Sequence, residues 1–266
     1  MIDLTNTTFI IPLCIESKDR EMNTFITLSY LCKYLHTNII VYEYDKVSKF
    51  CDIIGSINIG NSNLQHIFVS DETGNGIFHR TKFLNEMLIT VKTPVVVNYD
   101  IDILLKPDLY QKSSDLIING HDLVYPYFWK QHQRQINYTG RVKVFDTISL
   151  DTLNNSDYKI EDSEYGHCQF FNTKSYISGG MENEGFISWA PEDQERGHRF
   201  KTLGYKVMWS NNTQDYVYHI EHTRGSNSST NNPLLDHNNK LFAYIKSLPK
   251  DQLISYYKNV DYIKKY

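Results

Sequence analysis

The chain has 266 residues, 41% of them hydrophobic and 22% charged, and its 27 Lys and Arg against 31 Asp and Glu give a net charge of −4. This composition is typical of a folded globular chain and excludes a disordered tail. A general nucleic-acid-binding protein would carry a basic excess, so we expect no nucleic acid among its partners. No run of 18 apolar residues occurs in the sequence, and we expect no transmembrane segment.

Two further features favour a cytoplasmic location. The start, MIDLTNTTFIIPLCI, has no basic stretch ahead of its apolar one, so it predicts a strand rather than a signal peptide. Four cysteines are scattered along the chain without a C-x-x-C pair: Cys14, Cys32, Cys51 and Cys168. We expect them to be reduced, buried thiols rather than zinc ligands or a redox dithiol.

Strands and helices are predicted to alternate in the first half of the chain. Apolar, β-branched runs predict strands at 8–13, 38–42, 65–69 and 93–97. After the first strand, a helix is predicted whose apolar face comprises Phe25, Leu28, Leu31 or Cys32, and Leu35. A second helix is expected at about 81–89. This alternation predicts an α/β fold with a mostly parallel central sheet flanked by helices.

The second half of the chain is less regular. Aromatic-rich segments predict four further strands, in DLVYPYFW, HCQFFN, YKVMWS and YVYHI. A helix is expected after Pro191, and two more are expected near the C-terminus. The polar stretch GSNSSTNN at 225–232 predicts a mobile loop. No linker divides the chain, so we expect one domain over 1–266.

An acidic pair follows the fourth predicted strand, where Asp100 and Asp102 precede a Lys-Pro turn. Ligands of parallel α/β sheets bind at the carboxyl ends of strands, and side chains two residues apart in a strand point to the same side. A cation shared with a phosphate would relieve the repulsion between the two carboxylates. A solvated acidic turn is the alternative, and D-x-D alone does not exclude it.

A second candidate segment, GGMENEGFISWAPEDQERGHRF at 179–200, combines a glycine turn, an aromatic stretch and an acidic pair. Phe186 and Trp189 supply the aromatic rings, and Glu192 and Asp193 open the helix expected after Pro191. Acidic residues at a helix N-terminus are also ordinary caps, which accounts for either carboxylate alone. Capping does not account for the glycines and the tryptophan just upstream.

A third segment, HIEHTRG, ends a predicted strand and carries His219, His222 and Arg224. Two imidazoles and a guanidinium at a strand end are suited to a metal ion and a phosphate. A structural role for the histidines remains the alternative.

In this order, the segments resemble the nucleotide-sugar glycosyltransferases of the GT-A fold. The resemblance is to the β-1,4-galactosyltransferases and the related chondroitin-polymerase-like bacterial transferases, and it covers roughly residues 9–225. IFHRTKFLNEML followed by VVVNYDIDILL is similar to that family's arginine-containing helix and D-V-D strand. GGMENEGFISWAPEDQE is similar to its acceptor segment, HIEHTRG to its M-x-x-H-x-R segment, and PLCIESKDRE to its first nucleotide-contacting loop.

The resemblance implies a single GT-A, Rossmann-like domain. Its nucleotide-binding half would lie at about 1–110, its acceptor and metal half at about 111–225, and a flexible loop with C-terminal helices at 226–266. The expected donor-binding residues are Pro12, Arg20, Arg80, Asp100, Trp189 and Arg224. The expected ligands of Mn²⁺ or Mg²⁺ are Asp102, His219 at the family's methionine, and His222.

For catalysis, the resemblance implies that Asp193 is the general base and that Glu192 lies beside it. The implied reaction moves a hexose or N-acetylhexosamine from a UDP-sugar to a hydroxyl of a glycan, glycolipid or protein-linked acceptor, with inversion. Two alternatives stay open: a nucleotide-sugar- or carbohydrate-binding module that has lost catalysis, and a nucleotidyltransferase. The intact Asp102, His222 and Asp193 favour the enzyme over the binding module, and the acidic acceptor segment speaks against the nucleotidyltransferase.

The sequence departs from the family's pattern at several positions. W-G-W-G-G is replaced by ISWAP at 187–191, and the family's disulfides have no evident partners. Ser163, three residues before Gly166, aligns with a position that restricts the C2 substituent of the sugar, so its small side chain favours an N-acetyl group. We also expect the loop at about 225–235 to become ordered when metal and donor bind, with Arg224 pairing with the diphosphate.

Overall fold

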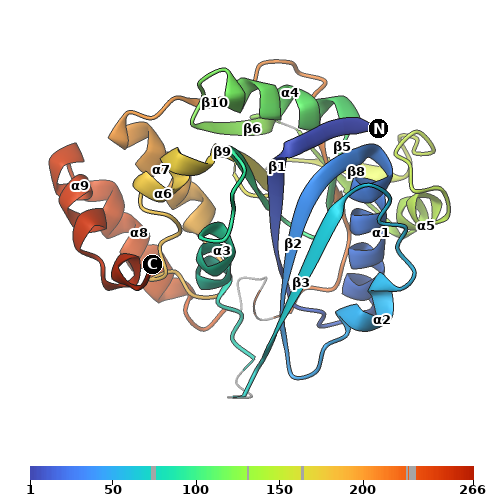
Figure 1. Cartoon of the computed structure of the whole chain (residues 1–266), viewed down its shortest axis with the longest axis horizontal. Helices are drawn as coiled ribbons and strands as arrows, with labels where there is room; N and C mark the ends of the chain where they lie inside the picture. The colour runs from blue at the N-terminus through green and yellow to red at the C-terminus, as the bar shows by residue number, and fades with distance from the viewer. Residues whose placement is uncertain (73–75, 131, 163–164, 226, 228–231) are drawn as a thin grey trace.

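The computed structural model describes residues 1–72, 76–130, 132–162, 165–225, 227 and 232–266 (Figure 1). Its centre is a seven-stranded sheet, in the spatial order β10 (Val207–Ser210), β6 (Leu123–Phe128), β9 (Cys168–Asn172), β4 (Val95–Tyr99), β1 (Ile2–Leu13), β2 (Leu35–Asp45) and β3 (Asn63–Ser70). Neighbouring strands are parallel except at β9, which runs antiparallel to both β4 and β6. The predicted α/β class with a mostly parallel sheet is confirmed.

Helices cover both sides of this sheet. In Figure 1, α1, α2 and α5 lie to the right of strands β1 to β3, whereas α3 and α6 to α9 lie to the left and α4 crosses the top. The helices are α1 (Lys18–Tyr34), α2 (Phe50–Ile54), α3 (Arg80–Leu88), α4 (Pro107–Ile118), α5 (Tyr138–Thr147), α6 (Thr173–Ser178), α7 (Glu192–Leu203), α8 (Leu235–Ser247), α9 (Lys250–Asn259) and the 3₁₀ helix η2 (Asp261–Lys265). None of the helices in the described part of the chain is long and apolar enough to cross a membrane.

The boundary between α1 and β2 differs from the prediction. Leu35 was expected on the apolar face of the helix, but it has the extended backbone angles φ −117° and ψ 144° and starts β2. It pairs in parallel with Ile2, so both strands are longer than their apolar runs. The sequence has no glycine or proline at this point to mark the end of the helix. Strand pairing therefore decides the boundary against the helical pattern.

A second, four-stranded sheet was not predicted. Its order is β5 (Ile103–Leu105), β11 (Val217–Ile220), β7 (Gln133–Ile136) and β8 (Tyr158–Glu161). Each strand has only three or four residues, too short for a clear alternation of apolar and polar side chains. Antiparallel pairing of β5 with β11 places Ile103 opposite His219, and the Ile220 N–H donates to the Asp102 carbonyl at 2.7 Å. This pairing brings the segment of Asp100 and Asp102 next to the HIEHTRG segment, although the two are distant in the sequence.

Aromatic packing supports the turn that carries the acidic pair. Phe9 in β1 packs edge-to-face against Tyr99 and Phe170, with ring centroids 5.4 and 6.2 Å apart. The Tyr99 hydroxyl donates to the Ile103 carbonyl at 2.8 Å and lies 2.6 Å from the hydroxyl of Tyr110. Tyr99 ends β4 and Ile103 starts β5, so this buried contact closes the loop between them.

The four cysteines are free thiols. Cys32 and Cys168 are buried, as expected, and Cys14 is half-buried. Cys51 is exposed on α2, so the expectation of a buried thiol was wrong there.

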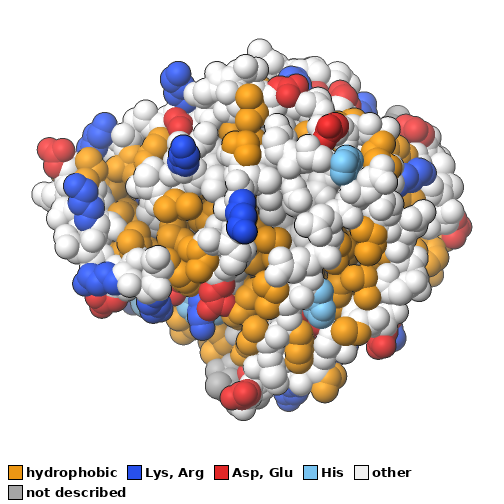
Figure 2. All heavy atoms as spheres, in the orientation of Figure 1, with side chains coloured by type: hydrophobic (Ala, Val, Ile, Leu, Met, Phe, Trp, Pro, Cys, Tyr) orange, Lys and Arg blue, Asp and Glu red, His pale blue; other side chains and the backbone are white. Residues whose placement is uncertain are grey.

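The charged side chains on the face shown in Figure 2 are scattered, with both signs among apolar groups.

Two glycines allow a test of the packing around α5. A Cβ added at Gly140 would lie 2.6 Å from the Asp157 carbonyl and 2.8 Å from a methyl of Ile136, whereas a Cβ at Gly55 would meet nothing within 4 Å. Gly140→Ala should therefore lower the free energy of unfolding by about 1–3 kcal/mol. Gly55→Ala, the matched control, should leave it unchanged or raise it by up to about 1 kcal/mol. Urea denaturation measures both, and equal effects would contradict the tight approach of α5.

Candidate active site

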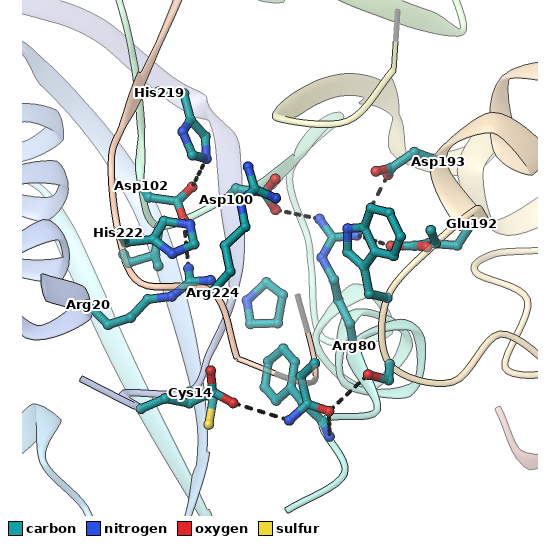
Figure 3. A pocket seen from close by; sticks show the side chains of 18 of the residues that line it. Cys14, Arg20, Arg80, Asp100, Asp102, Glu192, Asp193, His219, His222 and Arg224 are labelled. Atoms are coloured by element: carbon teal, nitrogen blue, oxygen red, sulfur yellow. Dashed lines mark hydrogen bonds and ion pairs between the residues drawn. The ribbon is translucent and has the colours of Figure 1, made fainter. Parts of the chain in front are cut away.

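The candidate residues of the sequence surround one cavity at the carboxyl ends of the central strands (Figure 3). Its volume is about 480 Å³, within the range of ligand-binding clefts. Every predicted site residue lines it: Pro12, Arg20, Arg80, Asp100, Asp102, Trp189, Glu192, Asp193, His219, His222 and Arg224. In Figure 3, Asp102, His219, His222 and Arg20 form one side, Glu192 and Asp193 form the opposite side, and Asp100 lies between them.

The two carboxylates of the D-x-D turn face different arginines. Asp100 accepts from Arg80 Nη2 at 2.6 Å, and Asp102 accepts from Arg20 Nη1 at 2.6 Å. The turn itself is held by the Asp100 N–H, which donates to the His167 carbonyl at 2.9 Å. His167 adopts a left-handed φ of 60°, unusual for a residue with a side chain. The residue just before β9 thus supports the acidic turn through its backbone carbonyl.

Asp102, His219 and His222 form a group with metal-ligand character. One ligand atom from each lies within 4.8 Å of the others. His222 Nε2 is 3.1 Å from Asp102 Oδ2, and His219 Nε2 is 3.6 Å from Asp102 Oδ1. His222 Nδ1 donates to the Thr223 carbonyl at 2.9 Å, so Nε2 is the ring nitrogen that faces the carboxylate. Two imidazoles gathered at one carboxylate are a set of residues that suits a divalent metal.

Burial sets the charge states in this group. The Asp102 side chain is 5% exposed. Burial acts to raise the pKa of Asp102, but the surrounding basic groups, Arg20 among them, outweigh it and hold the pKa below its ordinary value. Burial lowers the pKa of His219 to about 3, so its imidazole is neutral at pH 7. An ionised carboxylate beside a neutral imidazole is the state in which both bind metals.

The acidic pair opens α7, as predicted, and is surrounded by arginines. Asp193 Oδ1 accepts from Arg196 Nη1 at 2.7 Å, and Arg80 Nη1 lies 3.7 Å from the same oxygen. The same Arg80 nitrogen is 3.6 Å from Glu192 and has no hydrogen-bond partner in the described part of the chain. A Cβ added at Gly166, whose φ is 96°, would lie 3.0 Å from Asp193 Oδ2. A larger residue at Gly166 would crowd this second oxygen.

The two carboxyl groups differ in their proton affinity. Burial and the neighbouring Asp193 charge raise the pKa of Glu192. Burial also acts on Asp193, but the charges of Arg196 and Arg80 outweigh it and lower its pKa. Environments that separate the pKa values of neighbouring acids are typical of catalytic pairs. Glu192 is thus suited to hold a proton while Asp193 stays ionised.

Arg196 connects Asp193 to the core and was not predicted as a site residue. Its guanidinium is fully buried and donates to both oxygens of Glu182 at 2.6 Å. It also donates to Gln169 at 3.1 Å, and the Tyr176 hydroxyl donates to Glu182. Arg196 lies on the same face of α7 as Asp193, three residues later. In the sequence, only this spacing indicates that Arg196 contacts Asp193. Its contacts with Glu182 and Gln169 cannot be predicted in this way, because those residues lie in other segments.

The segment around Trp189 has a strained backbone. Ser188 and Ala190 take left-handed φ angles of 63° and 52°, which favour glycine. They stand where W-G-W-G-G of the resembled family has glycines. Asn238 and Asn232 donate to the carbonyls of Ile187 and Trp189, respectively, at 2.8 Å. Residues at the start of and just before α8 therefore hold the segment in a conformation its own residue types disfavour.

Several residues that line the cavity were not predicted from the sequence: Cys14, Glu16, Phe78, Tyr165 and Asn227. Asn227 joins three of the segments that form the cavity. Its side chain accepts from the Phe78 N–H and the Ser188 hydroxyl, and donates to Glu16 and the Gly76 carbonyl. Nothing in the sequence around Asn227 indicates these contacts. Ser163, and residues 226 and 228–231 of the expected mobile loop, lie outside the described residues.

The buried Arg196–Glu182 pair makes a prediction for stability. Arg196→Met leaves Glu182 buried without its cation and should lower the free energy of unfolding by about 3–5 kcal/mol. Adding Glu182→Gln removes the stranded charge and keeps an acceptor for Tyr176, so the double variant should recover at least about half of the loss. Urea denaturation of the two variants and the parent tests this. A single variant within about 1 kcal/mol of the parent would contradict the assigned pair.

No protein-family model and no curated protein matches the chain. Several solved structures match it in fold. The mannosyltransferase PcManGT from Pyrobaculum calidifontis, in complex with GDP-Man and Mn²⁺, matches with a TM-score of 0.50 and 13% identity over 83% of this chain and 58% of its own. GalNAc-T7 with UDP, GalNAc and Mn²⁺ matches with a TM-score of 0.51 and 12% identity over 82% and 44%. A mutant of Drosophila β-1,4-galactosyltransferase 7 with manganese, UDP-Gal and xylobiose has a TM-score of 0.46 and 14% identity over 84% and 72%.

The mannosyltransferase and GalNAc-T7 matches show a shared fold, and at 13% and 12% identity, respectively, they show the fold alone. The chain spans 58% and 44% of the length of these two neighbours. The GT-A fold implied by the resemblance in the sequence is confirmed: the chain has the fold of GT-A glycosyltransferases.

Proposed function

We propose that the protein is a metal-dependent glycosyltransferase that moves a hexose or N-acetylhexosamine from a UDP-sugar to an acceptor hydroxyl, with inversion. The observation that carries the proposal is the arrangement of the cavity. A metal-ligand group and an acidic pair face each other across it, and three arginines line it. This combination serves the two needs of the reaction, which are stabilisation of a diphosphate leaving group and removal of a proton from the acceptor.

The shared fold supports a nucleotide-sugar donor. The two neighbours with this fold were solved with Mn²⁺, one with GDP-Man and one with UDP and GalNAc. They differ in their nucleotide, so the choice of UDP here rests on the galactosyltransferase-like segments of the sequence. In this proposal, residues 1–110 bind the nucleotide and residues 111–225 supply the acceptor side and two metal ligands.

Asp102, His219 and His222 would hold the metal ion. When bound, a divalent cation acts as a Lewis acid that neutralises the charge growing on the diphosphate. Arg224 and Arg80 line the same cavity and supply guanidinium groups suited to phosphate oxygens.

Asp193 would act as the general base on the opposite side. Arg196 holds Oδ1, so Oδ2, beside Gly166, is the oxygen available to take the proton of an acceptor hydroxyl. Glu192, whose raised pKa favours the protonated form, would donate a hydrogen bond to a sugar oxygen. Because the base faces the metal group across the cavity, attack comes from the side opposite the leaving group and inverts the anomeric carbon. Trp189 would offer its ring to the acceptor, a glycan, glycolipid or protein-linked sugar.

The role of Asp102 predicts a specific binding defect. Asp102→Asn should abolish the Mn²⁺-dependent part of the affinity for UDP-galactose and UDP-N-acetylgalactosamine, because the amide carries no charge for the metal. Isothermal titration with and without Mn²⁺ measures this. Asp108→Asn makes the same chemical change at an exposed position on α4 and should bind like the parent. Unchanged affinity in Asp102→Asn would remove the residue from the metal site.

The role of Asp193 predicts a loss of turnover without a loss of binding. Asp193→Asn should slow hydrolysis of the UDP-sugar, in which water replaces the acceptor, by about 10²–10⁴-fold. Donor affinity should stay within about twofold, since a base contributes in the transition state. Asp108→Asn again serves as the control, because Asp108 also lies in the first turn of a helix. If turnover stays within a few-fold of the parent, Asp193 is only a helix cap.

A further inference from the structure

Arg20 binds the carboxylate that the metal ion would need. Its Nη1 donates to Asp102 Oδ2 at 2.6 Å, and His222 Nε2 lies 3.1 Å from the same oxygen. The side chains of Arg20 and Asp102 are 15% and 5% exposed. The guanidinium therefore supplies the charge that a buried carboxylate requires.

A divalent ion and this ion pair compete for one oxygen. A metal ion held by Asp102 and His222 would draw on the carboxylate oxygen nearest His222, which already accepts from Arg20. A dication and a guanidinium at such close range repel each other strongly in a site with little water. Metal binding therefore requires Arg20 to move away from Asp102 or to tolerate this repulsion.

The cavity offers the Arg20 side chain a second position, away from Asp102. Its side chain lines the cavity together with Arg80 and Arg224, where the proposed nucleotide would lie. Its Nε is buried and has no hydrogen-bond partner within the described residues, so the guanidinium uses only part of its bonding capacity on Asp102. The backbone of Arg20 is fixed in the first turn of α1, where its N–H donates to the Ser17 hydroxyl at 3.2 Å. Only the side chain needs to turn.

We propose that Arg20 neutralises Asp102 until a metal ion binds, and that the metal then releases Arg20 to the diphosphate of the nucleotide. This inference rests on the proposed function and concerns how its two ligands bind. The metal must displace an ion pair, and the nucleotide takes up the displaced guanidinium. Each ligand therefore increases the affinity for the other, and the coupling is reciprocal.

The test compares Mn²⁺ binding in the parent, Arg20→Gln and Lys18→Gln, followed by electron paramagnetic resonance of free Mn²⁺. Mn²⁺ is titrated alone and in the presence of UDP. Arg20→Gln should bind Mn²⁺ alone about tenfold more tightly than the parent, because no cation then has to leave Asp102. UDP should enhance Mn²⁺ affinity less in Arg20→Gln than in the parent, by about the same factor. Lys18→Gln removes the same charge from the same turn of α1, at a side chain 91% exposed, and should behave like the parent.

The outcomes separate this inference from the proposed function. Equal or weaker Mn²⁺ affinity in Arg20→Gln, with binding still lost in Asp102→Asn, would overturn the role of Arg20 and leave the metal site standing. No Mn²⁺ binding in any chain, with or without UDP, would overturn both. The parent provides a measurement that needs no variant: Mn²⁺ affinity unchanged by UDP contradicts the coupling. Circular dichroism melting of each variant shows whether it is folded before titration.

Discussion

A buried carboxylate needs a compensating cation, and much of the site is organised around that requirement at Asp102. The residue is 4% exposed, and its backbone lies in the turn between β4 and β5. The Arg20 guanidinium supplies this cation from α1, the imidazoles of His219 and His222 lie against the carboxylate from the end of β11, and the Ile220 N–H binds the Asp102 carbonyl. Asp102 thus ties together a helix, a turn and a strand from three distant parts of the chain.

A second group of charges that compensate one another lies on the opposite side of the cavity, around Arg196. Arg196 is fully buried and is shared between Glu182, which neutralises it, and Asp193, which it holds at the surface of the cavity. Arg80 lies between the two sides, since it binds Asp100 and lies close to both Glu192 and Asp193. In the proposed function, a phosphate that attracts Arg80 would weaken its effect on Asp193 and raise the proton affinity of that carboxylate. Donor binding would in this way prepare Asp193 for its proposed role as the base.

The C-terminal helices also shape the site, although they lie outside the resembled segments. Phe186 packs in a separate apolar cluster with residues of α8 and α9, among them Ile245 and Leu253. Asn232 and Asn238 bind the carbonyls on either side of Ser188, next to Trp189. Without these contacts, the left-handed angles at Ser188 and Ala190 would cost about 1–3 kcal/mol each with no compensation. The helices therefore help to place the tryptophan.

The amino-acid sequence alone determined the alternation of strands and helices and hence the α/β class, because β1, β2 and β4 contain continuous apolar, β-branched runs. Its motifs also indicated many of the residues that line the cavity, from Pro12 to Arg224, although not Cys14, Glu16, Phe78, Tyr165 or Asn227. The second sheet could not be predicted, since only β11 among its short strands was recognised, in YVYHI, and nothing in the sequence indicated the strands that pair with it. The partners of the charged groups could not be predicted either.

Only the tertiary structure decided that Arg20 binds Asp102 and that Arg196 joins Glu182 to Asp193. The first pair is separated by 82 residues in the chain, and Arg196 lies 14 residues from Glu182. Local spacing predicts which side chains share one face of a helix or strand. It cannot predict which charges meet when separate elements pack, because that depends on the strand pairing and the core that bring those elements together.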